Sequence, residues 1–136
     1  MSDKRTFIDS NVILYLYSDN DRRKELVIAL LNSDKTISTQ VVNENVNVCI
    51  RKIKLSKEEA FGHGKNLLEN FNVVNIYSST ITRAFDLSIK YRFSFWHSLI
   101  VATALENECE ILFSEDMQDG LVVDGTLKIV NPFKDI

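Results

Sequence analysis

Residues 94–120 read SFWHSLIVATALENECEILFSEDMQDG, and this stretch predicts a helix, a strand and an acidic loop in succession. Ser94 is a preferred residue at a helix start, and the residues up to about Asn107 are apolar on nearly every side of the helix that they would form. We therefore expect protein to cover this helix all round. Residues 110–114 then have the apolar character of a short strand.

The rest of the chain alternates between strand and helix patterns. Further strands are predicted at residues 5–9, 36–38, 73–76 and 127–130. Further helices are predicted at residues 12–17, 21–32, 39–54, 57–71 and 78–91. The apolar positions of the second of these helices are Leu26, Ile28, Leu30 and Leu31. Ser56 and Glu59 have the spacing of a capping box at the start of the fourth. This alternation predicts a three-layer α/β/α fold whose central sheet is mostly parallel.

Length and composition predict a single globular domain that spans residues 1–136. Of the 136 residues, 45% are hydrophobic and 26% are charged, which are ordinary values for a protein with one core. The formal net charge is −3, and this argues against the broad basic surface of a nonspecific nucleic-acid binder. Any nucleic acid would have to be held by local charge or by bound metal.

No membrane span or export signal is expected. The longest uncharged stretch, residues 93–105, is shorter than the roughly 20 residues that a membrane-spanning helix needs. The first residues, MSDKRTF, lack the apolar core of a signal peptide. Cys49 and Cys109 lie far apart in apolar helical stretches, so we expect buried reduced thiols. These features predict a cytoplasmic protein.

Acidic residues follow two of the predicted strands and lie early in one predicted helix. Asp9 closes the first strand, Glu115 and Asp116 follow the strand at 110–114, and Glu44 lies in the helix after the strand at 36–38. Ligands of open parallel sheets collect at the carboxyl ends of the strands, so these carboxylates are expected to form one concave cluster. Such a cluster suits Mg²⁺, and a bound divalent ion supports phosphodiester hydrolysis.

Each of these acids also has a plain structural interpretation. Asp9 could cap the helix that starts near Asn11, because Asp is a preferred N-cap residue. Glu115 and Asp116 could be solvated loop residues. Glu44 could be a charge at the edge of the apolar stripe of its helix. Taken singly, the residues leave these alternatives open.

Three stretches together resemble PIN domains, and specifically the VapC-type toxins of toxin–antitoxin pairs. They are FIDSNVILYLYS at 7–18, STQVVNE at 38–44 and the block at 94–120. The resemblance implies a Mg²⁺- or Mn²⁺-dependent endoribonuclease that acts on RNA, is usually a homodimer and is inhibited by a small antitoxin. In relatives an antitoxin helix binds near helices matching 21–32 and 57–70. Residues 14–17 could line that groove or belong to the core.

The resemblance also implies which residues form the site. Asp9, Glu44 and Asp116 match the first, second and last metal-binding acids of the family, and Glu115 could assist. Ser10 and Ser114 match hydroxyl residues that orient carboxylates or water, and Asn11 matches a polar residue that shapes the turn. At position 97 the family pattern has an Asp, and here His97 stands in its place as the remaining catalytic and metal-binding candidate.

His97 is also unusual for its place in the helix. It would be the third helical residue after Ser94, where an acid completes a capping box and complements the helix dipole. A neutral imidazole can bind Mn²⁺ or Zn²⁺ but is a poor ligand for Mg²⁺. The site also has one negative charge fewer than the family pattern. We therefore predict that RNA cleavage by this chain is reduced or absent.

Other functions compete with this interpretation. The chain could be a catalytically silent PIN domain that binds antitoxin or RNA. It could be a phosphotransfer enzyme with Asp9 as nucleophile, although such enzymes carry a second Asp where this chain has Asn11. A Ser/His/Asp hydrolase is weakly supported, because His63 falls in a helical stretch and no GxSxG sequence is present.

Overall fold

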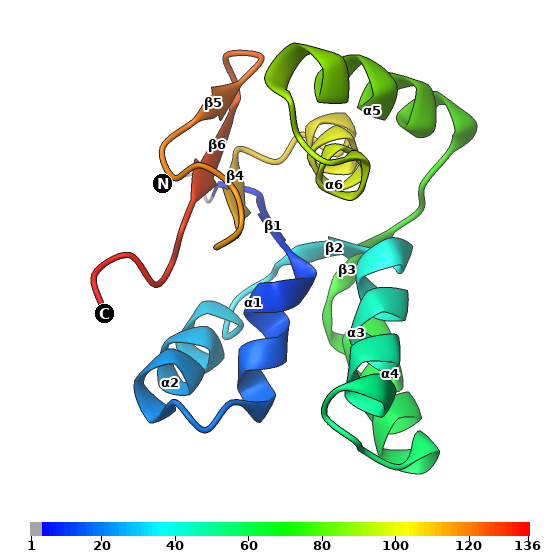
Figure 1. Cartoon of the computed structure of the whole chain (residues 1–136), viewed down its shortest axis with the longest axis vertical. Helices are drawn as coiled ribbons and strands as arrows, with labels where there is room; N and C mark the ends of the chain where they lie inside the picture. Colours follow the sequence, from blue (N-terminus) through cyan, green and yellow to red (C-terminus); the bar gives the residue numbers. More distant parts are fainter. Residues whose placement is uncertain (1–3) are drawn as a thin grey trace.

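The computed structural model describes residues 4–136, and these form a six-stranded sheet with helices on both faces (Figure 1). The strands are β1 (Thr6–Ile8), β2 (Thr36–Ser38), β3 (Asn72–Val74), β4 (Ile111–Phe113), β5 (Val122–Val123) and β6 (Leu127–Val130). Their spatial order is β3-β2-β1-β4-β6-β5. Every neighbouring pair is parallel except β5 with β6. The prediction of a mostly parallel sheet is therefore confirmed.

Helices connect the strands and cover the sheet. They are α1 (Ser10–Leu14), the 3-10 helix η1 (Tyr15–Tyr17), α2 (Asp21–Leu30), α3 (Thr39–Arg51), α4 (Lys57–Asn70), α5 (Ser78–Tyr91) and α6 (Phe95–Glu106). In Figure 1, α5 and α6 lie on one side of the sheet, and α1 to α4 lie on the other. This is the three-layer α/β/α arrangement that the alternation of strands and helices predicts.

Side-chain caps set the starts of α4 and α6. The predicted capping box of α4 is present, because the Glu59 N–H donates to Ser56 Oγ and the Ser56 N–H donates to Glu59 Oε1, both at 3.1 Å. Ser94 caps α6 through its side chain alone, since its Oγ accepts from the His97 N–H at 3.2 Å and no capping box forms. The cap thus places His97 in the first turn of α6.

The body of α6 and the two middle strands form the centre of the core. Phe7 of β1 and Leu112 of β4 have no exposed surface, and every residue of α6 from 98 to 104 is buried. The prediction of all-round burial is right for this part of the helix. It is wrong for the first turn, where Phe95 and Trp96 are 36% and 61% exposed.

Three local predictions need correction. The helix expected at residues 12–17 is split into α1 and η1. Strand β5 was not predicted, because two residues are too few to give an alternating pattern. Ile28, assigned from the sequence to the apolar positions of α2, is 53% exposed, because Val27 is the buried residue of α2 and the next residue is turned by about 100° around the helix.

The cysteines are buried free thiols, as the sequence predicts. Neither Cys49 nor Cys109 forms a disulfide, and burial raises the pKa of both thiols. Both side chains therefore stay protonated near neutral pH and are unreactive. Within residues 4–136, no helix combines the length and the apolar character needed to cross a membrane.

Helices α3 and α4 approach closely at one glycine, and this leads to a prediction about stability. A Cβ atom on Gly64 would lie 2.8 Å from Cγ2 of Val46, whereas a Cβ on Gly62 would meet nothing within 4 Å. We expect Gly62→Ala to raise the free energy of unfolding by about 0.5 to 1 kcal/mol through helix propensity. We expect Gly64→Ala to lower it by about 1 kcal/mol, because overpacking outweighs that gain. Urea unfolding checks both values, and equal effects would contradict the close packing.

Candidate metal centre

The carboxyl ends of β1 and β4 bring two predicted acids to one edge of the sheet. The two strands pair in parallel, with Ile8 in register with Phe113, and the Asp9 N–H continues the ladder by donating to the Phe113 carbonyl at 3.0 Å. Asp9 therefore lies beside the loop that begins at Ser114 and contains Asp116. The buried α6 brings its first turn to the same edge.

Three side chains converge at this edge. His97 Nε2 lies 3.8 Å from Asp9 Oδ2 and 3.9 Å from Asp116 Oδ2. One ligand atom from each residue lies within 4.8 Å of the other two. We call these residues the Asp–His–Asp cluster (Asp9, His97, Asp116). Of the four predicted site residues, the structure brings these three together.

Asp9 is the buried member of the cluster, with 4% of its surface exposed. Its Oδ2 accepts a hydrogen bond from Ser114 Oγ at 2.8 Å. Burial raises the pKa of Asp9 to about 6, while the bond from Ser114 and the nearby His97 partly oppose this shift. Asp9 is the N-cap residue of α1, but its side chain makes no capping hydrogen bond to that helix, so the cap interpretation describes its position in the chain and not the contacts of its carboxylate.

Asp116 is the more exposed acid of the cluster. Its Oδ2 accepts a short hydrogen bond from Asn11 Nδ2, and its backbone N–H donates to Ser114 Oγ at 3.3 Å. Ser114 thus contacts both acids. The Asn11 Oδ1 atom is buried and has no hydrogen-bond partner among the described residues. From the sequence, Asn11 was expected to shape the turn, and its contact with Asp116 was missed.

Glu44, the fourth predicted residue, lies beside the cluster and outside the group of three ligand atoms. Its Oε1 accepts a hydrogen bond from Ser10 Oγ at 2.7 Å, and Ser10 follows Asp9 directly in the chain. The charge of Glu44 contributes to the raised pKa of Asp9. The carboxylate is therefore close enough to act on the cluster, and a role as a metal ligand remains a prediction.

The His97 ring is oriented by the residue that caps its helix. Its Nδ1 lies 3.0 Å from Ser94 Oγ, and its side chain is 28% exposed. With Nδ1 directed to Ser94, the opposite nitrogen, Nε2, faces the two carboxylates. The structure therefore places His97 Nε2 beside Asp9 and Asp116, and the role of His97 as a metal ligand stays a prediction.

Glu115 is held away from the cluster by residues of η1 and α2. Tyr15 Oη donates to its Oε1 at 2.7 Å, and Arg23 Nη1 lies 3.2 Å from its Oε2. The Arg23 guanidinium also lies 5.0 Å from the ring centroid of Phe133, in the range of a cation–π contact. Glu115 thus ties the loop to the helices. The sequence signal for Arg23 was overlooked because basic residues on a helix are commonly solvated.

Gln40 is a second residue at this edge that the sequence analysis missed. It lies four residues before Glu44 on α3, so the two share one face of the helix. Its Nε2 donates to the Trp96 carbonyl at 3.4 Å, and its Oε1 is buried without a hydrogen-bond partner in the described part of the chain. The four-residue spacing between Gln40 and Glu44 is the sequence feature that could have indicated that Gln40 lies near the site.

His63 lies elsewhere, in α4. The residue is buried, its Nε2 lies 3.0 Å from Asn45 Oδ1, and burial lowers its pKa. Tyr17 packs edge-on against the imidazole, with ring centroids 5.2 Å apart. These contacts belong to the packing of α4 against α3 and η1, and they give no support to a Ser/His/Asp hydrolase.

A model of the PIN domain family matches residues 6–118. This match covers most of the chain, and it includes the Asp–His–Asp cluster and Glu44. The chain belongs to the PIN domain family. The family resemblance inferred from the sequence is therefore confirmed. No match is found among curated protein sequences.

Solved structures of toxin–antitoxin proteins share the fold of this PIN domain. A toxin–antitoxin complex from Klebsiella pneumoniae has a TM-score of 0.70 and 21% identity, covering 93% of this chain and 97% of that one. VapC20 from Mycobacterium tuberculosis, described as a sarcin-ricin loop cleaving toxin, has a TM-score of 0.67 and 15% identity over 80% and 88% of the two chains. VapBC2 from Rickettsia felis, bound to a promoter DNA fragment, has a TM-score of 0.66 and 15% identity over 93% and 98%.

The donor set of this PIN domain fits a divalent cation. Nitrogen and oxygen ligands lie about 2.0 to 2.2 Å from a divalent cation the size of Zn²⁺. The separations of 3.8 and 3.9 Å between His97 Nε2 and the two carboxylate oxygens therefore leave room for such an ion between them. The raised pKa of Asp9 reflects a buried carboxylate without enough nearby positive charge. The Asn11 Oδ1 atom, on the same side chain that contacts Asp116, is buried and has no hydrogen-bond partner among the described residues.

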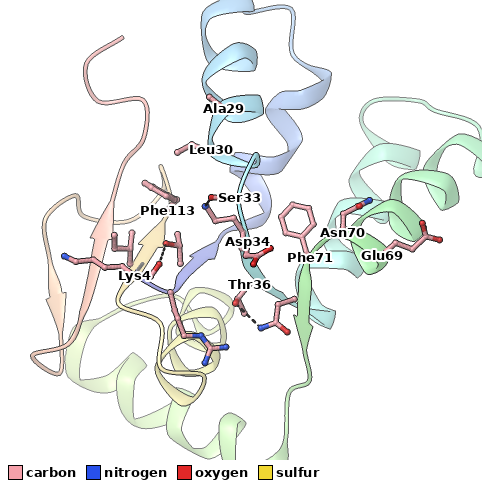
Figure 2. Close-up of a pocket in the computed structure, with 15 residues that line it drawn as sticks. Lys4, Ala29, Leu30, Ser33, Asp34, Thr36, Glu69, Asn70, Phe71 and Phe113 are labelled. Carbon is pink, nitrogen blue, oxygen red and sulfur yellow. Dashed lines mark hydrogen bonds between the residues drawn. The ribbon is translucent and has the colours of Figure 1, made fainter. Parts of the chain in front are cut away.

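Figure 2 shows a pocket of about 1180 Å³ at the opposite edge of the sheet. Its lining includes Thr6, Thr36, Asn72 and Ile111, which are the first residues of β1, β2, β3 and β4. The dashed bond between two of them is Asn72 Nδ2 donating to Thr36 Oγ1 at 3.2 Å. Ligands of parallel sheets bind at the other, carboxyl edge, and no residue of the Asp–His–Asp cluster lines this pocket. The candidate functional site is therefore the Asp–His–Asp cluster and not this pocket.

Proposed function

We propose that this PIN domain is a metal-dependent endoribonuclease toxin of a VapBC-type toxin–antitoxin pair, and that it acts in the cytoplasm. The observation that supports this most directly is the convergence of Asp9, His97 and Asp116 at the carboxyl edge of the sheet. A bound Mg²⁺ or Mn²⁺ would activate water and neutralise charge on the scissile RNA phosphate. Hydrolysis of this kind needs no covalent intermediate.

The proposed roles of the side chains follow from their contacts. Asp9, His97 and Asp116 hold the ion, and Glu44 completes its surroundings from α3. The Ser114 hydroxyl orients the Asp9 carboxylate, and the Ser10 hydroxyl orients Glu44. The Asn11 amide holds Asp116. Because every member is tied to a neighbour, the donors are positioned before an ion arrives.

The proposal is tested by RNA cleavage with the purified chain. With Mn²⁺, we expect cleavage that EDTA abolishes and that Asp116→Asn lowers by at least about a hundredfold, because the variant loses an anionic ligand of the ion. Ser114→Ala should have a smaller effect, since it removes only a hydrogen bond to a ligand. Cleavage that is unchanged by EDTA would rule out a metal-dependent mechanism.

A catalytically silent PIN domain that binds antitoxin or RNA is the second candidate. The observation that favours it is His97 itself, since a neutral imidazole leaves the cluster with two anions. Thermal unfolding with and without Mn²⁺ separates the two candidates, because an ion that binds the folded state raises the melting temperature by mass action. The silent candidate predicts no shift and no cleavage.

We also propose that a cognate antitoxin binds the face built from η1, α2 and α4. Support comes from the toxin–antitoxin complexes that share the fold. Tyr17, Phe61 and Leu68 are 38%, 49% and 54% exposed on this part of the molecule. Exposed apolar residues of this kind mark protein interfaces when they lie together. Tyr15, in contrast, packs against Phe133 with ring centroids 4.5 Å apart.

A homodimer is proposed to form through α5. Tyr77, Ile81, Phe85 and Ile89 lie four residues apart and are 63%, 38%, 51% and 80% exposed, so they share one helix face. The Phe85 ring contacts Phe95, which contacts Trp96 in turn, with centroids 5.6 and 5.5 Å apart. This apolar stripe is continuous with the first turn of α6, next to His97.

We expect Ile89→Glu to convert the dimer to a monomer. A charge buried in an apolar interface costs several kcal/mol unless it is paired, whereas the same charge on a free surface costs little. Ile28→Glu is the matched control, because Ile28 is an exposed isoleucine of α2. Light scattering after gel filtration gives the mass of each variant. If Ile89→Glu stays dimeric, the dimer uses another surface.

A further inference from the structure

The Asp–His–Asp cluster offers one nitrogen and two oxygen donors, and this donor set differs from an all-carboxylate site. We propose that it selects later first-row ions such as Fe²⁺ or Co²⁺ over Mg²⁺, with Mn²⁺ intermediate and with His97 Nε2 as a direct ligand. The inference rests on the proposed metal dependence and deepens it. According to this inference, His97 weakens the binding of Mg²⁺ and also determines which other divalent ion the site prefers.

The contact between His97 and Ser94 directs the ligating nitrogen. Ser94 Oγ already accepts the His97 backbone N–H at 3.2 Å, and a hydroxyl oxygen has a second lone pair. Ser94 Oγ can therefore also accept the ring Nδ1–H at 3.0 Å. That tautomer leaves the lone pair of Nε2 free toward the carboxylates. Histidine ligands generally have such a partner on the other ring nitrogen, which fixes tautomer and orientation.

The separation of the donors favours an ion between them over direct contact. Nε2 is 3.8 and 3.9 Å from the two carboxylate oxygens, beyond the roughly 3.2 Å limit of a good hydrogen bond. The described residues give Nε2 no hydrogen bond. Asp9 is instead bonded to Ser114 and Asp116 to Asn11. Each donor is thus held by an outer residue, and no hydrogen bond joins one donor of the cluster to another within the described residues.

The chemistry of the donors determines the order of preference. Mg²⁺ is bound through oxygen atoms and keeps several waters. Imidazole suits Fe²⁺, Co²⁺, Ni²⁺ and Zn²⁺, and the affinity of a given nitrogen–oxygen site rises from Mn²⁺ through Fe²⁺ to Co²⁺. Replacing one anionic oxygen by neutral nitrogen removes the charge attraction for all ions equally. Only the later ions regain affinity from the nitrogen.

Titration calorimetry on the metal-free full-length chain tests this preference. Co²⁺, Mn²⁺ and Mg²⁺ are the probes, and Zn²⁺ is avoided because it also binds cysteine. We expect the ratio of Co²⁺ to Mg²⁺ affinity to fall by at least about tenfold in His97→Asp, which restores an oxygen donor. The Asn side chain of His97→Asn is similar in size to Asp but has neither its charge nor an imidazole. This variant should therefore bind all three ions weakly.

The ligand itself can be observed without measuring activity. In the Co²⁺ protein, a histidine bound through Nε2 gives a strongly shifted, exchangeable Nδ1–H proton signal by NMR, and this signal should be absent in His97→Asp. Ser94→Gly removes the partner of Nδ1 at a small cost to the helix cap, so we expect Co²⁺ affinity to fall about tenfold. Ser94→Thr keeps a hydroxyl and should retain the affinity.

The outcomes separate this inference from the proposed function. Equal Co²⁺ to Mg²⁺ ratios in the wild type and His97→Asp, with no shifted N–H signal, would overturn the selectivity while leaving metal-dependent cleavage intact. If none of the three ions binds the wild-type chain, both proposals are wrong. If His97→Asp loses the shifted N–H signal and also shows the expected fall in the ratio of Co²⁺ to Mg²⁺ affinity, His97 is established as a ligand.

Discussion

Replacing His97 with Asp is expected to increase the rate of Mg²⁺-dependent RNA cleavage by about tenfold to a hundredfold. An anion about 4 Å from a divalent cation contributes up to about 8 kcal/mol at an effective dielectric constant near 20, before desolvation is subtracted. A quarter of that value already corresponds to about thirtyfold in ion affinity. Because His97 Nε2 lies 3.8 and 3.9 Å from the two acids, an Asp in this first turn comes close to the same ion.

The gain in cleavage rate should come from the negative charge of the new Asp, and a matched variant without that charge tests this. His97→Asn has nearly the shape of His97→Asp without its charge, so we expect no gain in cleavage at any Mg²⁺ concentration. Rates measured across a Mg²⁺ titration separate weak ion binding from slow chemistry. Equal cleavage by wild type and His97→Asp at low Mg²⁺ would contradict a metal-binding role for position 97.

The same replacement should make the metal-free protein less stable. An added carboxylate would repel Asp9, which is 4% exposed and has a pKa raised by burial to about 6. The melting temperature of metal-free His97→Asp is therefore expected to lie below that of the wild type. The rise in melting temperature on adding Mg²⁺ should be larger in the variant. An imidazole at position 97 thus favours the metal-free fold.

Asp9→Asn is expected to stabilise the metal-free protein by about 1 to 3 kcal/mol above pH 7 while abolishing metal-dependent cleavage. The pKa of Asp9 is about 6 in the folded state against 3.8 for a solvated Asp side chain, and each pKa unit corresponds to about 1.4 kcal/mol. Ionisation of the Asp9 side chain therefore lowers the stability of the folded state. Asn removes the charge and keeps an oxygen that can accept the Ser114 hydrogen bond.

The pH dependence of this effect has a defined sign. Below about pH 4 Asp9 is protonated in both the folded and the unfolded state, and the two proteins should differ little. Between about pH 4 and 6 the unfolded state releases its proton first, so the wild type loses stability relative to Asp9→Asn as the pH rises. Above about pH 6 the difference should be constant. The relevant measurement is urea unfolding from pH 4 to 8 in EDTA.

Asp116→Asn is the control for the stability experiment. The Asp116 side chain is 54% exposed, so its charge is largely solvated and its removal should change stability by no more than about 0.5 kcal/mol. Both variants are expected to lose cleavage. If Asp9→Asn is less stable than the wild type at pH 8, the buried carboxylate is not a cost to the metal-free fold. Stability traded for function is common at active sites.

The last third of the chain illustrates how far patterns along a sequence reach. The apolar run after Ser94 and the strand that follows it predicted α6 and β4 closely, because burial on all sides demands apolar residues at every position. The parallel pairing of β1 with β4 then brings Asp9 to the loop after Phe113. The approach of His97 to both acids follows from elements that the sequence already specifies.

Other features depend on partners that are distant in the chain. Glu115 and Asp116 are neighbours with the same charge, yet Arg23 holds one of them and the Asp–His–Asp cluster contains the other. Glu44 is held by Ser10, at a separation of 34 residues. No local pattern distinguishes these cases, since side-chain direction is chosen by hydrogen bonds between elements.

The sequence by itself predicts the order of strands and helices, the burial of α6 and the identity of the candidate donors. Local preference and periodicity encode them, and these act over a few residues. Which acid joins the Asp–His–Asp cluster, which acid is tied to α2 and how the His97 ring is turned were settled only in the folded molecule. Their physical cause is packing between segments up to about a hundred residues apart, where a few tenths of an ångström decide whether a donor is free or bonded.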